Sequence, residues 1–255
     1  MSPRQIRFAA LVRREVTRFM KIKRQTLGAP LLETFMYISV FGAALGSRID
    51  KLHGVDYVVF IIPGLIMMAW AMNAFTNNSS SILQQKFQRA IDDQLSSPAS
   101  PFELLMAFSL GGFLRGMLVA ILTFCAAAVL VEIPVENVIV LVSSLVLVGL
   151  FFAQLGVLVG IRAEQFDDVS FYQTFILQPL IFLGGVFYSA TLLPEPFQTL
   201  TYFDPVYYMI GLVRYGFLDY SDANVALSLT VLLAATTTLV AVNYRLFARG
   251  YRLRT

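Results

Sequence analysis

Long apolar runs dominate the sequence and limit what it can fold into. A helix needs roughly 20 apolar residues to cross the hydrocarbon core of a bilayer. Runs of about this length fall near residues 31–46, 56–75, 103–130, 137–161, 170–190 and 224–246. Since 57% of the 255 residues are hydrophobic and only 14% are charged, one water-soluble core could not bury the apolar surface. The sequence therefore predicts an all-α polytopic membrane protein with six transmembrane helices.

The inventory of reactive side chains excludes several activities. Cys125 and His53 are the only residues of their types, so a disulfide framework, a histidine-based metal site and a Ser-His-Asp triad lack material. A phosphate-binding P-loop needs Gly directly before its Lys. The lysines follow Met20, Ile22, Asp50 and Gln85. We therefore expect no catalytic residue, no metal and no nucleotide bound by this chain itself.

The N-terminal residues, about 3–25, have the pattern of an amphipathic helix. Apolar side chains recur at three- and four-residue spacing at Phe8, Leu11, Val12, Val16, Phe19 and Met20. Basic side chains gather opposite, at Arg7, Arg14, Arg18 and Lys21. Such a helix lies in a membrane interface beside anionic lipid. The alternative is a cytosolic helix packed on the rest of the protein.

The distribution of Lys and Arg predicts orientation, because cytoplasmic loops carry an excess of both. The side that holds both termini and the loops near 76–102 and 162–169 has most of them. The other side has only Arg48, Lys51 and Arg214, and Arg115 falls inside the third run. Both termini are therefore expected in the cytoplasm.

Two segments between the runs are unusual. Residues 82–96 predict a short amphipathic helix, with Leu83, Phe87, Ala90, Ile91 and Leu95 on one face. It could be a connecting elbow or a docking helix for a cytoplasmic partner, and composition leaves both open. Residues 190–223 mix prolines with aromatic side chains, as in a re-entrant element before the last span.

Three ordered motifs carry a resemblance to a known family. They are "FIIPGLIMMAW" (60–70), "KFQRAIDDQLSSPASPFELL" (86–105) and "QPLIFLGGVFYSATLLPEPFQTLTYFDPVYYMIGLVRYGFLD" (178–219). Together they resemble the ABC-2 type transporter permeases, and most closely the small six-span branch of the bacterial inner membrane. The resemblance covers residues 1–255 as a single ABC-2 type transmembrane domain. One departure is Asp204, where the family more often has Asn.

The resemblance implies a half-transporter. Two copies of the permease would form a homodimer, and two separate ATPase subunits would bind ATP and Mg beneath it, with membrane lipid around it and no nucleic acid. A hydrophobic or amphipathic substrate would move outward across the bacterial inner membrane. The residues implied to couple the permease to the ATPase are Gln85, Phe87, Gln88, Arg89, Ile91, Asp92, Asp93 and Leu95.

Polar groups within the apolar runs are further candidates. Arg115 is an intramembrane charge, and a structural ion pair with Glu33 is favoured over substrate contact. Gly156 and Gly160 have a spacing that lets helices pack closely. The residues expected along a substrate path are Trp70, Asn73, Phe75, Tyr172, Phe175, Gln178 and Phe182.

Two other classes of membrane protein fit the sequence less well. An ion-coupled secondary transporter normally needs intramembrane acids or matching broken spans, and only Glu33 lies near the interior of a run. A membrane enzyme would have to work with one His, one Cys and no G-x-S-x-G sequence. Both are less favoured than a transport permease.

Overall fold

The computed structural model describes residues 2–45 and 51–253, and helices make up most of it. The first half comprises α1 (Pro3–Lys21), the π-helix η1 (Arg24–Gly28), α2 (Ala29–Leu45), the hairpin β1 (Lys51–Leu52) and β2 (Val55–Asp56), α3 (Tyr57–Phe87), α4 (Ala90–Ser96) and α5 (Pro101–Leu130). The second half comprises α6 (Val138–Arg162), α7 (Phe166–Phe171), the π-helix η2 (Tyr172–Leu177), α8 (Gln178–Leu183), the 3-10 helix η3 (Ala190–Leu192), α9 (Glu195–Phe203), α10 (Pro205–Leu218) and α11 (Val225–Arg249).

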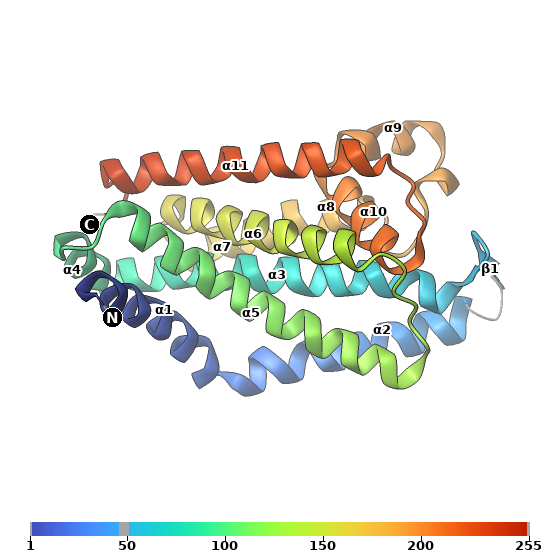
Figure 1. The fold of residues 1–255 in the computed structure, drawn as a ribbon, viewed down its shortest axis with the longest axis horizontal. Helices are drawn as coiled ribbons and strands as arrows, with labels where there is room; N and C mark the ends of the chain where they lie inside the picture. Colours follow the sequence, from blue (N-terminus) through green and yellow to red (C-terminus); the bar gives the residue numbers. More distant parts are fainter. Residues whose placement is uncertain (1, 46–50, 254–255) are drawn as a thin grey trace.

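The helices form an elongated bundle with α3 along its centre (Figure 1). One end, which we call the α4 end, holds α4, the start of α1 and the last turns of α11. The opposite α9 end holds the β-hairpin, α9 and α10. Both ends of the chain therefore lie at the α4 end, as expected for a chain that crosses the membrane an even number of times.

Within residues 2–45 and 51–253, four helices are long and apolar enough to cross a membrane: α3, α5, α6 and α11. The first predicted span corresponds to α2, which has 17 residues. The fifth is divided among α7, η2 and α8, with 6 residues each. The fold is thus an all-α polytopic membrane protein, and the total of six spans stays a prediction.

The predicted helix 82–96 is two helices. α3 continues to Phe87, and Arg89 then takes the left-handed conformation at φ 55° before α4 begins at Ala90. The prediction of one continuous helix was wrong here. The amphipathic pattern continues through the turn at Arg89, so the pattern gave no sign of that turn. The prolines act as expected: Ser100 caps α5, its hydroxyl accepting from the Glu103 amide, and Pro101 opens the helix.

The N-terminal helix packs on the bundle. α1 ends at Lys21 rather than near residue 25, and the π-helix η1 follows. Arg4 and Arg7 form ion pairs with Glu103 in the first turn of α5, at 2.6 and 2.9 Å. Part of the basic face that was expected to meet lipid therefore contacts protein. The helix thus has the amphipathic pattern of an interfacial helix and also the protein contacts of a packed cytosolic helix.

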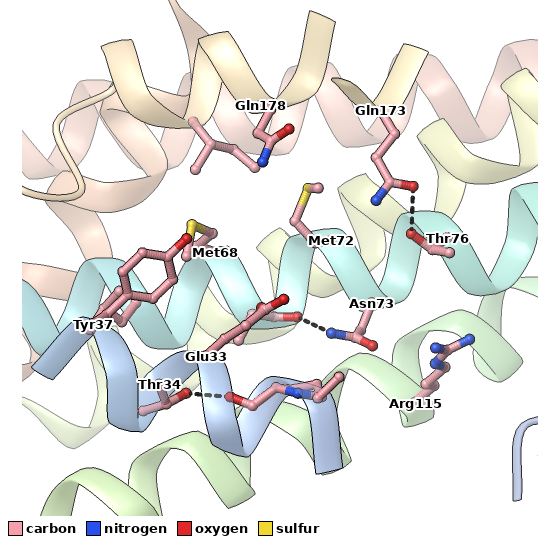
Figure 2. Close-up of a pocket in the computed structure, with 15 residues that line it drawn as sticks. Glu33, Thr34, Tyr37, Met68, Met72, Asn73, Thr76, Arg115, Gln173 and Gln178 are labelled. Atoms are coloured by element: carbon pink, nitrogen blue, oxygen red, sulfur yellow. Dashed lines mark hydrogen bonds between the residues drawn. The ribbon is translucent and has the colours of Figure 1, made fainter. Parts of the chain in front are cut away.

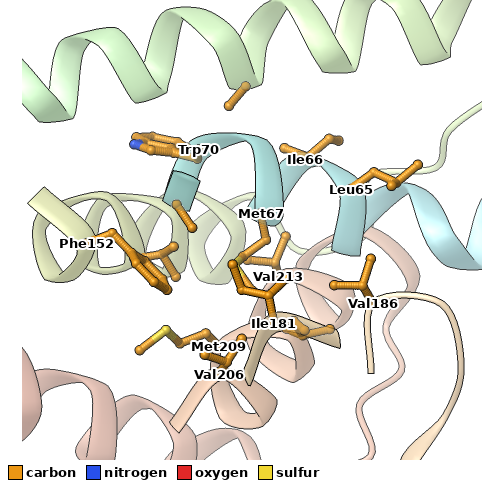
Figure 3. Close-up of a cluster of buried hydrophobic side chains, with 14 of the residues drawn as sticks. Leu65, Ile66, Met67, Trp70, Phe152, Ile181, Val186, Val206, Met209 and Val213 are labelled. Carbon is orange, nitrogen blue, oxygen red and sulfur yellow. The ribbon is translucent and has the colours of Figure 1, made fainter. Parts of the chain in front are cut away.

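Glycines allow α3 and α6 to approach closely. A Cβ on Gly156 would lie 2.4 Å from the carbonyl oxygen of Phe75, and one on Gly160 would lie 2.9 Å from that of Ser79. The close helix packing predicted from their spacing is confirmed. Around this contact, side chains of α3, α6, α8 and α10 form a buried apolar cluster (Figure 3) that includes Leu65, Ile66, Met67, Trp70, Phe152, Ile181, Val206, Met209 and Val213.

The region before the last span enters the bundle. α9 and α10 meet at Asp204, which caps α10 by accepting from the Val206 amide at 2.9 Å. α10 packs against α3, α6 and α11, and its 14 residues are mostly buried. Pro205 in the first turn fits this start, because a helix has no partner for that amide.

Candidate functional site

The short helix α4 has two faces at the α4 end of the bundle. Ile91 is buried and Leu95 half-buried, and both pack in an apolar cluster with Leu104, Phe108, Ile161, Phe247 and Leu253. Gln88, Arg89 and Asp93 are exposed and Asp92 is half-buried. The aromatic ring of Phe87 is 58% exposed and stacks on Phe166. Seven of the eight predicted coupling residues therefore either present polar or aromatic surface or form the apolar base beside it.

A buried amide chain connects α4 to α1. The side-chain amide of Gln94 in α4 donates to the side-chain oxygen of Gln85 in α3. The side-chain amide of Gln85 in turn donates to the Glu15 carboxylate of α1 at 3.1 Å. Ser81 also donates to Glu15 at 2.6 Å, and Arg14 pairs with the same carboxylate at 2.9 Å. Because Glu15 is fully buried, these donors offset the cost of removing its charge from water. The sequence reasoning found Gln85 but missed Glu15, an acid on an otherwise basic helix.

Further polar contacts hold the α4 half of the bundle together. Arg18 of α1 donates to the backbone and side-chain oxygens of Asn77, at 2.7 and 2.8 Å. Asn78 donates across to the Ala153 carbonyl oxygen of α6. Lys86 donates to the carbonyl oxygen of Ile161 in the last turn of α6 and to that of Ala163, which follows the helix. Side-chain hydrogen bonds thus link α1 to α3 and α3 to α6 in this half of the bundle.

A pocket of about 290 Å³ opens between α2, α3, α5 and the η2–α8 segment. Figure 2 shows its polar lining: Glu33 and Thr34 from α2, Asn73 and Thr76 from α3, Arg115 from α5, and Gln173 and Gln178 from η2 and α8. Thr76 donates to Gln173 at 3.1 Å and so joins two walls. Tyr37, Met68 and Met72 supply apolar lining.

The pocket brings Glu33 and Arg115 into one site without pairing them. Among the described residues, no ion pair joins the two side chains (Figure 2). Glu33 is exposed, whereas Arg115 is buried. The predicted structural pair is therefore not formed in this conformation, although both side chains line the same pocket.

The residues expected along a substrate path fall into separate environments. Asn73 and Gln178 line the pocket. Trp70 and Phe75 are buried in helix packing, and Trp70 also borders a separate apolar cavity of about 210 Å³. Tyr172 is half-buried, and Phe175 and Phe182 are exposed on the outside of the η2–α8 segment. The structure thus brings only two of the seven together in one pocket.

A buried charge pair at the α9 end was missed by sequence reasoning. Arg214 of α10 lies 3.2 Å from Asp222 and donates to the Gly185 carbonyl oxygen at 2.7 Å. Its guanidinium lies 4.0 Å from the ring centre of Phe60. The distribution of Lys and Arg placed Arg214 among the charges of the outer side and did not predict a pair with Asp222. The only local signals were the Gly-Gly pair and an Asp eight residues after Arg214.

Asp204 at the start of α10 is also buried, at 2% exposure. One carboxylate oxygen caps Val206, and the other has no hydrogen-bond partner among the described residues. Burial raises the pKa of Asp204 from its ordinary value of 3.8 to about 6. When protonated, the Asp204 side chain would be a neutral hydrogen-bonding group. It would then resemble the Asn that is more common at this position in the family that the sequence resembles.

Long apolar helices around a half-polar pocket define a multi-pass helical membrane protein. The sequence pattern of the ABC-2 type transporter family matches residues 6–218. The chain therefore belongs to the ABC-2 type transporter family, which confirms the resemblance.

Characterised relatives agree with this assignment. The chain is 39% identical over 241 residues to the inner membrane transport permease YadH of Escherichia coli K12, with 94% of each chain covered. It is 29% identical over 238 residues to nodulation protein J of Rhizobium leguminosarum bv. viciae, covering 89% of this chain and 88% of that relative. This protein is thus similar to transport permeases along nearly its whole length, and the likeness supports an inner membrane protein.

Proposed function

We propose that this chain is the transmembrane subunit of an ATP-driven exporter. Two copies would form a homodimer, two ATPase subunits carrying ATP and Mg would bind the α4 ends, and a hydrophobic or amphipathic substrate would move outward. ABC-2 type permeases generally work with an ATPase subunit, and the family assignment supports such a partner here. The six-span count and cytoplasmic termini belong to the same proposal and rest on the apolar runs and the Lys and Arg distribution.

The observation that carries this proposal is the connection of α4 to the rest of the bundle. The exposed side of α4 presents Arg89 and Asp93, while its buried side is linked through Gln94 and Gln85 to Glu15. A partner that pushes on α4 would therefore displace α3 and α1 together. α3 also lines the pocket, so the same movement would change the shape of the pocket.

The first test is purification of the tagged chain from its native membranes in gentle detergent. We expect a co-purifying P-loop protein with vanadate-sensitive ATPase activity. The double variant Arg89→Ala with Asp93→Ala changes two exposed side chains and should lose that partner while keeping its own thermal stability. A matched control, Glu132→Ala with Glu136→Ala, changes exposed acids in the loop before α6 and should retain the partner.

Two outcomes would contradict the proposal. If no ATPase is recovered even after crosslinking through residues 86–95, a secondary transporter becomes the better reading, and transport should then respond to a proton gradient and to Glu33→Gln. Orientation has its own test: a C-terminal alkaline phosphatase fusion should be inactive and a green fluorescent protein fusion should fluoresce. An active phosphatase would place the α4 end outside.

A further inference from the structure

Arg115 is a buried charge for which the described residues supply no partner. Its side chain is 7% exposed, it forms no ion pair or side-chain hydrogen bond with them, and its Nε atom is buried without an acceptor. An unpaired buried charge is costly, and proteins normally give it a counter-ion. Arg214 in the same chain shows the usual solution, with Asp222 and a backbone carbonyl as partners.

The lining of the pocket around Arg115 has two characters. Asn73, Thr76 and Gln173 lie on the same side of the pocket as Arg115 in Figure 2 and offer neutral hydrogen-bonding groups. Met68 and Tyr37 lie toward the other side and offer apolar surface. A site with a few polar groups and an apolar wall fits a ligand with a polar head and an apolar tail.

Two π-helices border this pocket. η1 ends at Gly28, directly before the lining residues Ala29 and Pro30, and η2 contributes Gln173. π-helices are rare, occur mostly as single turns and are found frequently at functional sites. η2 thus lies on one wall of the pocket and η1 directly precedes another wall, which is an observation independent of the charge on Arg115 and points to the same place.

We propose that this pocket binds an amphiphile that carries an oxyanion, with Arg115 as the counter-ion and the apolar part of the ligand along Met68 and Met72. A guanidinium suits this role because its planar set of donors matches phosphate and carboxylate groups. Glu33 lies in the same pocket on α2, so the oxyanion belongs at the α5 side. This inference deepens the proposed function, since it names the class of cargo that the exporter would carry.

The test is equilibrium binding to the purified full-length chain in dodecyl maltoside. The probes are octyl phosphate, octyl glucoside and inorganic phosphate, each titrated by calorimetry. We expect octyl phosphate to bind, Arg115→Gln to weaken it at least tenfold and Arg115→Lys to weaken it less. Arg249→Gln removes an exposed charge at the end of α11 and should leave the dissociation constant unchanged.

Several results would overturn the proposal. Equal binding of octyl phosphate to wild type and Arg115→Gln would exclude Arg115 as the counter-ion, and equal binding of octyl glucoside would exclude the need for an anion. Inorganic phosphate binding as tightly as octyl phosphate would show a free-anion site instead of an amphiphile site.

Stability separates ligand binding from a structural role. Because Arg115 has no described partner, Arg115→Gln should unfold at the same or a higher temperature than wild type without ligand. Should that variant fail to fold, Met72→Trp keeps Arg115, fills the pocket and should still abolish binding. The assay contains no ATPase, so failure to find an ATPase partner and failure to bind octyl phosphate are separate results.

Discussion

The guanidinium of Arg214 lies 3.2 Å from the carboxylate of Asp222, and both side chains are almost completely buried. Asp222 also accepts from Ser189 at 2.6 Å and from Tyr220. The pair therefore joins α10 to the turn after α8 and to the loop before α11. This polar link adds to the apolar packing of α10 against α3, α6 and α11.

Removing one partner of this pair should be strongly destabilising. Arg214→Gln leaves Asp222 buried without its cation, and we expect a loss of roughly 3–5 kcal/mol. The double variant Arg214→Gln with Asp222→Asn should recover part of that loss, because neither charge is then left alone. Thermal unfolding in detergent measures both, with Arg249→Gln as the exposed control; a single variant as stable as this control would show that the pair is dispensable.

The contact between α3 and α6 should not tolerate an added methyl group. Gly156→Ala would place a Cβ 2.4 Å from the Phe75 carbonyl oxygen, which is backbone and cannot move aside. Overpacking of this kind costs about 1–3 kcal/mol. Gly28→Ala is the matched control, since nothing lies within 4 Å of its added Cβ. We expect Gly156→Ala, but not Gly28→Ala, to lower the unfolding temperature. Equal unfolding temperatures for the two variants would mean that α3 and α6 separate easily.

Asp204 should make stability depend on pH. It lies between α9 and α10, outside the four spanning helices, and burial raises its pKa from 3.8 to about 6. Between these values the folded state binds more protons than the unfolded state, so stability falls as pH rises. The shift corresponds to a change on the order of 2–3 kcal/mol.

The comparison for this prediction is Asp204→Asn, which cannot ionise. Its stability relative to wild type should increase from pH 4 to pH 6 and then level off. Unfolding temperatures of both proteins across this range supply the measurement. Parallel curves for Asp204→Asn and wild type would refute a buried, proton-binding carboxylate.

The sequence predicted the elements that depend on local pattern. Apolar length located α3, α5, α6 and α11, and the Ser100-Pro101 pair marked the start of α5. It could not predict contacts between distant polar residues, because Glu15 and Gln85 are 70 positions apart and nothing in periodicity joins them. Glu33 and Arg115 show the converse: charge alone suggested a pair, but the structure places both on the lining of one pocket without an ion pair between them.

The amide chain between α4 and α1 should transmit force without binding the ATPase. Gln85 accepts from Gln94 and donates to Glu15, and it is itself buried at 7% exposure. Gln85→Ala removes both bonds and leaves the exposed surface of α4 unchanged. We therefore expect the ATPase to co-purify as with wild type, while transport-linked ATPase activity falls several-fold.

Stability should also fall in this variant, by roughly 1–3 kcal/mol, because the Glu15 carboxylate loses a donor inside the protein. Gln84→Ala is the control, since its side chain is exposed and lies one position away on the same helix. Loss of ATPase binding in Gln85→Ala would show that the chain shapes the docking surface itself. Full activity with an intact complex would mean that force reaches the pocket through another route, such as the hydrogen bond from Ser81 to Glu15 or the contact of Arg18 with Asn77.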